Sequence, residues 1–453
     1  MHPLTELIRS DMKPALGVTE PGAIAYAVCT AGSYLTGDIR RITLRLNSGI
    51  YKNAFTCGIP NSSHYGNLYA AALGAVAGDP EKGLECLAGV TEEDNRMAEK
   101  LVDEGRVTAE MSGISSRIYI SATVQKGNST ATAVIRDVHT NITRIEVNGM
   151  VVFGKNDSGA ADTDSSASRM SAGSEAHGAD LAAKLAASAE QPAASEDPLI
   201  HQYSLEELVR YADTVDIAEL DFIREAFRMN MELFEEGKQS ARTTYLHYLL
   251  ERNGGEVISK DEAQTAALLC SGAIEARVLG LDKPAMSITG SGSHGIIATL
   301  PLYAAAKIRD IPEEKLLRAT ALSFLICMYI KEYSGRLSAF CGCGIAAGTG
   351  MSLGLVYLAG GEVPEMTKCL NNMASGITGM ICDGGNHGCA MKALVACDSA
   401  FRSAGLAMHG AEIESIHGIN GMTPENTMRN MGRIASPGMV ATEGTIVDIM
   451  QEK

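Results

Sequence analysis

Hydrophobic and polar residues alternate with a period of two in several stretches of the segment 37–155. Ile42, Leu44 and Leu46 alternate with polar residues, as do Ile118, Ile120 and Val124, and the stretches "TATAVIRDV" and "TRIEVNGMVVF" are rich in strand-forming residues. This alternation is typical of strands that bury one face. The pattern therefore predicts four strands of a half-buried antiparallel sheet.

The apolar period changes to a helical one elsewhere in the chain. Helices are expected over about 67–78 and 91–104, throughout 1–36, and in long amphipathic stretches of 199–453 that are broken by glycine loops. The predicted fold class is α+β, with a small sheet layer in 37–155 followed by a large all-α domain in 199–453. We expect 1–36 to pack with this all-α domain.

The segment 156–198 differs in composition from both of these regions. It is rich in Ala, Ser, Asp and Gly, and it has no aromatic and no β-branched apolar residue. Such a composition buries too little apolar surface to offset the entropy of ordering. The sequence therefore predicts a flexible linker or insertion here.

Charge and apolar content restrict the class of protein. The formal net charge of −16 argues against a nucleic-acid partner and gives no reason to expect binding to an anionic membrane surface. The N-terminus has no apolar run of signal-peptide length, and the longest apolar run, "ATALSFLICMYI", is too short to span a bilayer. We expect a cytoplasmic protein in which most of the eleven cysteines are reduced.

Four cysteines near the C-terminus carry the strongest chemical signal. Cys341 and Cys343 lie in "SAFCGCGIAAGTG", and Cys382 and Cys389 lie in "GMICDGGNHGCAMKA". Thiolates select zinc, copper(I) or iron–sulfur clusters. The spacing differs from the usual C-x2–4-C pairs of structural zinc sites. The residues alone therefore leave open an iron–sulfur cluster, a four-thiolate zinc site and four unliganded thiols.

Two further glycine-containing segments, "SGIYKNAFTCGIPNSSHYGN" and "TGSGSHG", carry polar groups. The loop "TGSGSHG" precedes a predicted helix, so its backbone N–H groups could bind an anion, although a plain helix–helix turn is an equal alternative. His64 and His294 each follow a serine, and a loop histidine is more often a polar surface residue than a catalytic one. The candidate site residues of these loops are Lys52, Asn53, Ser62, Ser63, His64, Gly290, Ser291, Gly292, Ser293 and His294.

Taken together, these segments resemble the L-cysteine desulfidase family, which is related to the α chain of iron–sulfur L-serine dehydratase. The resemblance covers nearly the whole chain outside 156–198. It rests on "TEP" at 19–21, "KN" at 52–53, "GIP" at 58–60, "GSG" at 290–292 with "GIIATLP" after it, "SGRLSAFCGCGIAAGTG" and "CDGGNHGCAMK". The last two motifs are specific in order, spacing and flanking residues.

The resemblance implies a [4Fe–4S] cluster held by three cysteines, with one iron open to substrate. Carried over by position, Cys382 and Cys389 are ligands, and the third ligand is Cys341, with Cys343 as its substitute. The activity implied is β-elimination from a small amino acid, which gives a keto acid and ammonia, with sulfide released when the substrate is cysteine. We also expect a homo-oligomer.

The chain departs from the desulfidase pattern at three places. Val18 occupies the position of a cysteine before "TEP", Ser62, Ser63 and His64 match an SSH sequence of serine dehydratases, and His294 stands where the family often has glutamine. These departures concern the leaving group of the substrate and leave the elimination chemistry unchanged.

The expected roles of the site residues follow from this chemistry. His64 is the preferred base because an imidazole suits proton transfer near neutral pH, and His294 and Lys52 are the other catalytic candidates. The substrate carboxylate would be held by Asn53, Lys52 and the backbone of 290–295, and Ser62, Ser63 and the side chains of 290–293 are further substrate-binding candidates. Three alternatives remain: a serine dehydratase-like deaminase, a non-catalytic small-molecule-binding homologue, and a zinc-stabilised helical protein.

Overall fold

The computed structural model of the protein describes residues 1–115, 117–155, 198–335 and 337–453. The predicted linker 156–198 therefore falls, apart from its last residue, outside the described part. The chain divides into two compact units. We call Thr19–Glu196 the sheet unit, and Met1–Val18 together with Asp197–Lys453 the helical unit.

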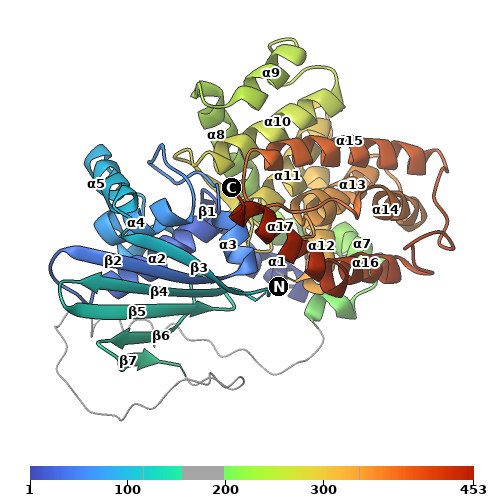
Figure 1. Ribbon diagram of the computed structural model, residues 1–453. Helices are drawn as coiled ribbons and strands as arrows, with labels where there is room; N and C mark the ends of the chain where they lie inside the picture. Colours follow the sequence, from blue (N-terminus) through green and yellow to red (C-terminus); the bar gives the residue numbers. More distant parts are fainter. Residues whose placement is uncertain (116, 156–197, 336) are drawn as a thin grey trace. The chain divides into compact units, whose positions relative to one another are not determined.

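The described part of the sheet unit contains one six-stranded sheet with helices packed on it (Figure 1). The strand order is β3-β2-β4-β5-β6-β7. The elements of this unit are α2 (Thr19–Gly32), β2 (Ile39–Asn47), α3 (Ser48–Ala54), α4 (Asn67–Ala77), η1 (Pro80–Glu85), α5 (Glu92–Asp103), β3 (Val107–Gly113), β4 (Tyr119–Lys126), β5 (Ser129–Arg136), β6 (Ile142–Val147) and β7 (Met150–Gly154).

The buried face of this sheet explains the alternation seen in the sequence. Ile42, Leu44 and Leu46 on β2 are fully buried. They lie on the same sheet as β4 and β5, against which helix α2 packs, and every residue of α2 is buried. A helix that is apolar on all sides is stable only inside a core. Helix α2 is thus the central element of this unit.

Two features of the sheet differ from the prediction of four antiparallel strands. The stretch "TRIEVNGMVVF" is a hairpin, because Asn148 and Gly149 both have positive φ and separate β6 from β7. Strand β3 pairs parallel to β2, with Ile42 opposite Val107. Most residues of β3 are exposed or half-buried, so the sequence of β3 lacks a clear apolar–polar alternation. Parallel strands are joined by a long connection that usually contains helices, so no local sequence pattern predicts their pairing.

The helical unit is built around helices that are buried on nearly all sides. Helix α10 packs against α8, α9, α11 and α15, and α12 packs against α11, α13 and α16. The elements of this unit are α1 (Pro3–Asp11), β1 (Lys13–Leu16), η2 (Leu199–Gln202), α7 (Leu205–Thr214), η3 (Ile217–Ile223), α8 (Arg224–Gln239), α9 (Thr244–Arg252), α10 (Glu262–Val278), β8 (Pro284–Ser287), α11 (Gly292–Ile308), α12 (Glu313–Ser334), η4 (Cys343–Ala347), α13 (Gly348–Leu358), α14 (Val363–Ile377), α15 (Gly388–Met408), α16 (Pro424–Arg433), η5 (Ile434–Gly438) and α17 (Val440–Gln451).

The N-terminal segment is divided between the two units after Val18. Strand β1 pairs antiparallel with β8, and the Ser287 hydroxyl donates a hydrogen bond of 2.7 Å to the Lys13 carbonyl. Pro14 and the positive φ of Gly17 interrupt the helix predicted over 1–36. Only 1–18 therefore groups with the helical unit, and α2 belongs to the sheet unit.

The predicted α+β class is confirmed, because a sheet region early in the chain is followed by a largely helical one. None of the helices in the described ranges is long and apolar enough to cross a membrane.

Candidate functional site

The two cysteine loops of the helical unit are joined by backbone hydrogen bonds. Phe340 and Ile381 form an antiparallel bridge. The amide of Cys341 donates to the Met380 carbonyl at 3.1 Å, and the amide of Cys382 donates to the Ala339 carbonyl at 2.6 Å. Two motifs that lie about forty residues apart in the sequence are thereby held side by side.

The thiols of these loops interact with one another. The sulfur of Cys341 accepts the Gly344 amide at 3.5 Å. The neighbouring Cys343 thiol lowers the pKa of Cys341 to about 7, against the opposing effect of burial, and Cys341 in turn raises the pKa of Cys343. Cys382 and Cys389 are close enough to contribute further electrostatic interactions with Cys343. The four cysteines therefore form one thiol cluster.

Two lysines, Lys331 and Lys392, lie near the thiol cluster. Lys331 is buried, and its ammonium donates to the Gly335 carbonyl at 2.7 Å. Burial lowers the pKa of Lys331, although the nearby cysteines oppose this effect. Lys392 forms an ion pair with Asp383, and this pair, with the cysteines, outweighs burial and raises the pKa of Lys392. Positive charge beside thiols favours the thiolate, which is the metal-binding form.

The donor set fits a soft-metal centre. Thiolates from two loops converge with cations that would offset the negative charge of a thiolate-bound cluster. Within the described ranges, no group of three or more His, Cys, Asp or Glu residues has the arrangement of a ready-made metal site. In the structure, Cys341 accepts the Gly344 amide and the Cys389 thiol donates to the Gly384 carbonyl, each at 3.5 Å.

His294 lies against the turn between the first two cysteines. A Cβ atom added to Gly342 would lie only 2.7 Å from Nε2 of His294. Nδ1 lies 2.5 Å from the hydroxyl of Thr289, and that hydroxyl donates its proton to the Ile288 carbonyl. The contact with Thr289 thus holds the His294 ring with its Nε2 atom beside the cysteine turn.

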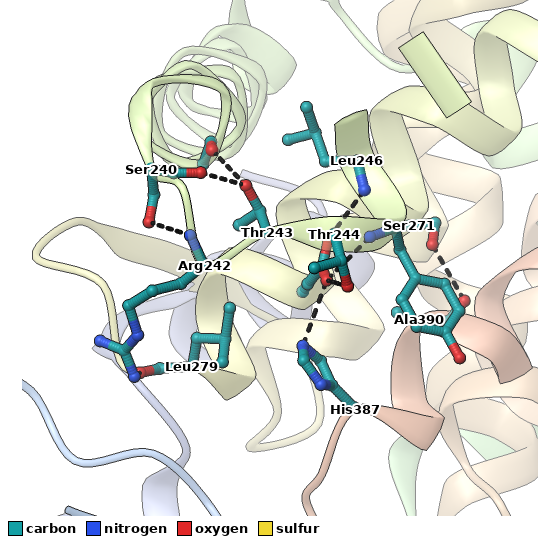
Figure 2. Close-up of polar contacts among 12 residues, drawn as sticks. Ser240, Arg242, Thr243, Thr244, Leu246, Ser271, Leu279, His387 and Ala390 are labelled. Carbon is teal, nitrogen blue, oxygen red and sulfur yellow. Dashed lines mark hydrogen bonds and ion pairs between the residues drawn. The ribbon is translucent and has the colours of Figure 1, made fainter. Parts of the chain in front are cut away.

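The loop between Cys382 and Cys389 is tied to helix α10 by a buried carboxylate. Nε2 of His387 lies 3.1 Å from the fully buried Glu275, which also accepts the amides of Tyr245 and Leu246 at 3.0 and 2.8 Å. Figure 2 shows His387 and the Leu246 amide approaching this carboxylate from different elements. The Ser271 hydroxyl binds the Ala390 carbonyl at 3.1 Å, which gives α10 a second contact with the start of α15.

The predicted "GSG" segment lies at the N-terminus of helix α11. Ser291 is the N-cap residue but makes no side-chain capping bond. Gly292 and Ser293 are buried, and Gly290 and Ser291 are half-buried. The Ser293 hydroxyl accepts a bond of 3.0 Å from Arg277 of helix α10.

In the sheet unit, Asn53 belongs to a buried polar cluster. Its amide donates to Glu20 at 3.0 Å, and Nε2 of His139 lies 3.8 Å from the same Glu20 oxygen. Burial opposes the ionisation of Glu20, but His139 and Asn53 outweigh it and lower the pKa of Glu20 to about 2. Lys52, on the same short helix as Asn53, is also buried.

The predicted Ser-Ser-His sequence has mixed surroundings in this unit. The buried Ser62 donates to Asn95 and accepts the backbone amide of His64 at 3.1 Å, whereas Ser63 is exposed. The His64 ring stacks on Tyr69, with centroids 4.1 Å apart and planes 2° apart. The structure thus gives His64 an aromatic partner and leaves its catalytic role a prediction.

The sequence interpretation missed four residues that the structure brings to these clusters. Glu20, Glu275 and Arg277 are charged residues inside otherwise apolar helices, which was a usable signal because such residues are rarely buried without a purpose. His139 lies in the turn between β5 and β6, and no local pattern distinguished it.

Comparison with known proteins places these motifs in a family. A family model described as the serine dehydratase alpha chain matches residues 81–448. The chain belongs to the serine dehydratase alpha-chain family. The relationship inferred from the cysteine motifs is thereby confirmed. The family description points to a lyase of the dehydratase or deaminase kind.

Relatives of full length support this assignment. A UPF0597 protein of Clostridium botulinum is 38% identical over 99% of this chain and 98% of its own length. UPF0597 proteins of Caldanaerobacter subterraneus and Geobacter sulfurreducens are 35% and 34% identical, again over 99% of this chain and 98% of theirs. The similarity therefore covers both units.

Proposed function

We propose that the protein is an iron–sulfur-dependent lyase that eliminates the β-substituent of a small amino acid and releases a keto acid and ammonia. The observation that carries the proposal is the pairing of the two cysteine loops into one thiol cluster beside Lys331 and Lys392. Membership of the serine dehydratase alpha-chain family supports the same reaction class.

Cys382, Cys389 and Cys341 would hold a [4Fe–4S] cluster, with Cys343 as the alternative third ligand. Such a cluster supplies a Lewis acid for the leaving group. Asp383 and Glu275 would keep the ligand loop in place, through Lys392 and His387 respectively.

His294 is the first candidate for the base in this proposal. Its Nε2 atom lies beside the cysteine loop, and the Thr289 hydroxyl fixes the ring by its contact with Nδ1. The imidazole would take the α-proton, the β-substituent would leave, and water would then hydrolyse the resulting enamine to the keto acid and ammonia. His64 and Lys52, which lie in the sheet unit, remain proposed catalytic residues, and Asn53, Ser62 and Ser63 remain proposed substrate-binding residues.

A hydroxyl leaving group is the favoured variant of this proposal. Val18 is buried and offers neither a ligand nor a base where desulfidases carry a thiol. The family description names a serine dehydratase. L-serine is therefore the first substrate to test and L-cysteine the second. If Val18→Cys alone desulfurises cysteine, the native protein acts on a different leaving group.

The deciding experiment is anaerobic purification followed by assays of iron, sulfide, keto acid and ammonia. Cys382→Ser and Cys389→Ser should lose the cluster and its broad visible absorbance. Cys369→Ser is a matched control, because Cys369 is buried outside the loops next to Ser352. Zinc at one ion per chain with no sulfide would overturn the cluster assignment. Intact cluster without turnover of any β-substituted amino acid would overturn the activity.

The base assignment has its own test. His294→Ala should reduce turnover by about a hundredfold or more, the usual scale for the loss of a general base, with the cluster retained. His64→Ala measured in parallel separates the two histidines. Unchanged turnover in His294→Ala, with a large loss in His64→Ala, would assign the role to His64.

A further inference from the structure

Arg277 is a buried cation to which the described residues supply no ion-pair partner. It lies near the end of helix α10 and only 4% of its surface is exposed. Its one hydrogen bond goes from Nη1 to the neutral hydroxyl of Ser293 at 3.0 Å, and its buried Nε has no hydrogen-bond partner in the described part of the chain. No Asp or Glu of the described ranges forms an ion pair with it.

A buried guanidinium in this state is unusual. Buried charges are normally paired, because removal from water is costly unless an opposite charge or several hydrogen bonds replace the solvent. Arginine has five N–H donors, arranged to bind a carboxylate or phosphate with two parallel bonds. The described residues around Arg277 therefore leave its guanidinium without the oxyanion that it is shaped to bind.

The guanidinium is directed at the start of helix α11. A Cβ atom added to Gly292 would lie 2.5 Å from Nε of Arg277, so the side chain packs directly on the Gly292 backbone. Helix α11 is seventeen residues long and Ser291 does not cap it. The free N–H groups and the positive end of the helix dipole thus lie beside the unpaired cation.

We propose that Arg277 and the first turn of α11 form a binding site for a small carboxylate. Gly290 and Ser291 are half-buried and provide the approach from solvent, whereas Gly292 and Ser293 form the buried end. Glu275, on the same helix, is already used by His387 and two backbone amides, so it does not compete for the guanidinium.

On the proposed function, which this step presupposes, the carboxylate is that of the amino-acid substrate. Ser293, which binds Arg277, directly precedes His294, whose Nε2 lies against the cysteine turn. A substrate held by its carboxylate at Arg277 would then have its α-carbon close to the proposed base and its β-carbon closer to the thiol cluster. Arg277 would bind and orient the substrate without moving a proton.

Binding is tested first with ligands that cannot react. L-alanine has the carboxylate and amine but no β-leaving group, and L-alaninol lacks the carboxylate. In calorimetry on the full-length protein, L-alanine should bind and L-alaninol should not. Arg277→Lys should weaken L-alanine binding by about 10- to 100-fold, because a point charge replaces the two parallel bonds. Inorganic phosphate is added as a third probe, and binding as tight as that of L-alanine would overturn the preference for a carboxylate.

Two further variants separate binding from folding. Gly292→Ala keeps the arginine but displaces its guanidinium, so it should also weaken L-alanine binding. Arg309→Gln removes an exposed arginine paired with Glu262 and should change nothing. L-alanine should raise the melting temperature of the wild type and of Arg309→Gln, but not that of Arg277→Lys. A lower melting temperature in Arg277→Lys with an unchanged response to L-alanine would mean that Arg277 has only a structural role.

The same data distinguish failure of this site from failure of the proposed activity. Arg277-dependent binding of L-alanine without turnover of serine or cysteine would support the site and refute the activity. Turnover with unchanged KM in Arg277→Lys would refute the site and leave the activity in place.

Discussion

Glu20 shows how a single buried side chain makes stability depend on pH. Its pKa is about 2 in the folded protein against 4.5 for a free side chain. Because the folded pKa is the lower one, ionised Glu20 stabilises the fold above pH 4.5, and this stabilisation is lost as the pH falls from 4.5 toward 2.

Glu20→Gln tests this dependence, because it removes the charge with little change in shape. Near pH 7 the variant should melt at a lower temperature than the wild type, and the difference should shrink as the pH falls toward 3. Glu110→Gln, an exposed substitution in the same unit, should show no such trend. A constant difference between wild type and Glu20→Gln at all pH values would contradict the prediction.

Cys341 and Cys343 differ in their surroundings, although the sequence places them almost together. The sulfur of Cys341 accepts the Gly344 amide, and the neighbouring Cys343 thiol lowers the pKa of Cys341, so these surroundings favour a thiolate. Cys341→Ser should therefore abolish cluster incorporation, whereas Cys343→Ser should retain iron and sulfide near wild-type levels. Loss of iron in Cys343→Ser alone would reassign the third ligand.

At the residue scale, the sequence predicted those members of the candidate site that stand in local motifs. The four cysteines, His294 and the "GSG" segment were all named from neighbouring residues. Arg277 and His139 were not. The apolar helix around Arg277 indicates burial, but only the folded chain shows that no described carboxylate pairs with it, and the contact of His139 with Glu20 forms only on folding.

At the scale of elements, α10 connects the proposed carboxylate site to the ligand loop. Its buried polar residues contact α9, α11 and the start of α15 through Glu275, Arg277 and Ser271. Glu275 both caps α9 and holds His387, so the helix fixes two otherwise separate segments (Figure 2).

Substitutions of Glu275 and of His387, which form this contact, should differ in their effect on stability. Glu275→Gln replaces a carboxylate that accepts the Tyr245 and Leu246 amides and lies 3.1 Å from Nε2 of His387, so it should lower the free energy of unfolding by about 1–3 kcal/mol. His387→Ala removes only the side chain opposite Glu275 and leaves the cap of α9 intact, so its effect should be smaller. Hydrogen exchange at the Tyr245 and Leu246 amides should become faster in Glu275→Gln only. Faster exchange of these amides in His387→Ala as well would show that the loop, rather than Glu275 alone, orders α9.

Elements were predicted well where the apolar period is strong. The helices expected over 67–78 and 91–104 are α4 and α5, with ends that differ by one residue. The prediction was wrong at β1, where four residues pair with β8 in a distant part of the chain. It also missed the parallel pairing of β3. Both depend on long-range backbone hydrogen bonds, which a local pattern does not encode.

At the scale of the whole molecule, the polar segment 156–197 connects the two units. The described residues on either side are held by their own units. The backbone amide of Lys155 donates a hydrogen bond of 2.9 Å to the Thr143 carbonyl. The His201 ring stacks on the Tyr333 ring, with centroids 3.8 Å apart. Neither anchor requires a residue of the segment, and the composition of the segment is too polar to form a core.

Replacing 156–197 with a Gly/Ser linker of about half its length should therefore leave both units intact. We expect the melting temperature to stay within about 2 °C of the wild type, since loop length changes closure entropy only slowly, and cluster content to be unchanged. A matched variant with the segment residues in scrambled order keeps the length and composition. A loss of several degrees in both variants would show that the sequence of the segment stabilises the fold. A loss in the shortened variant alone would mean that the connection must be long.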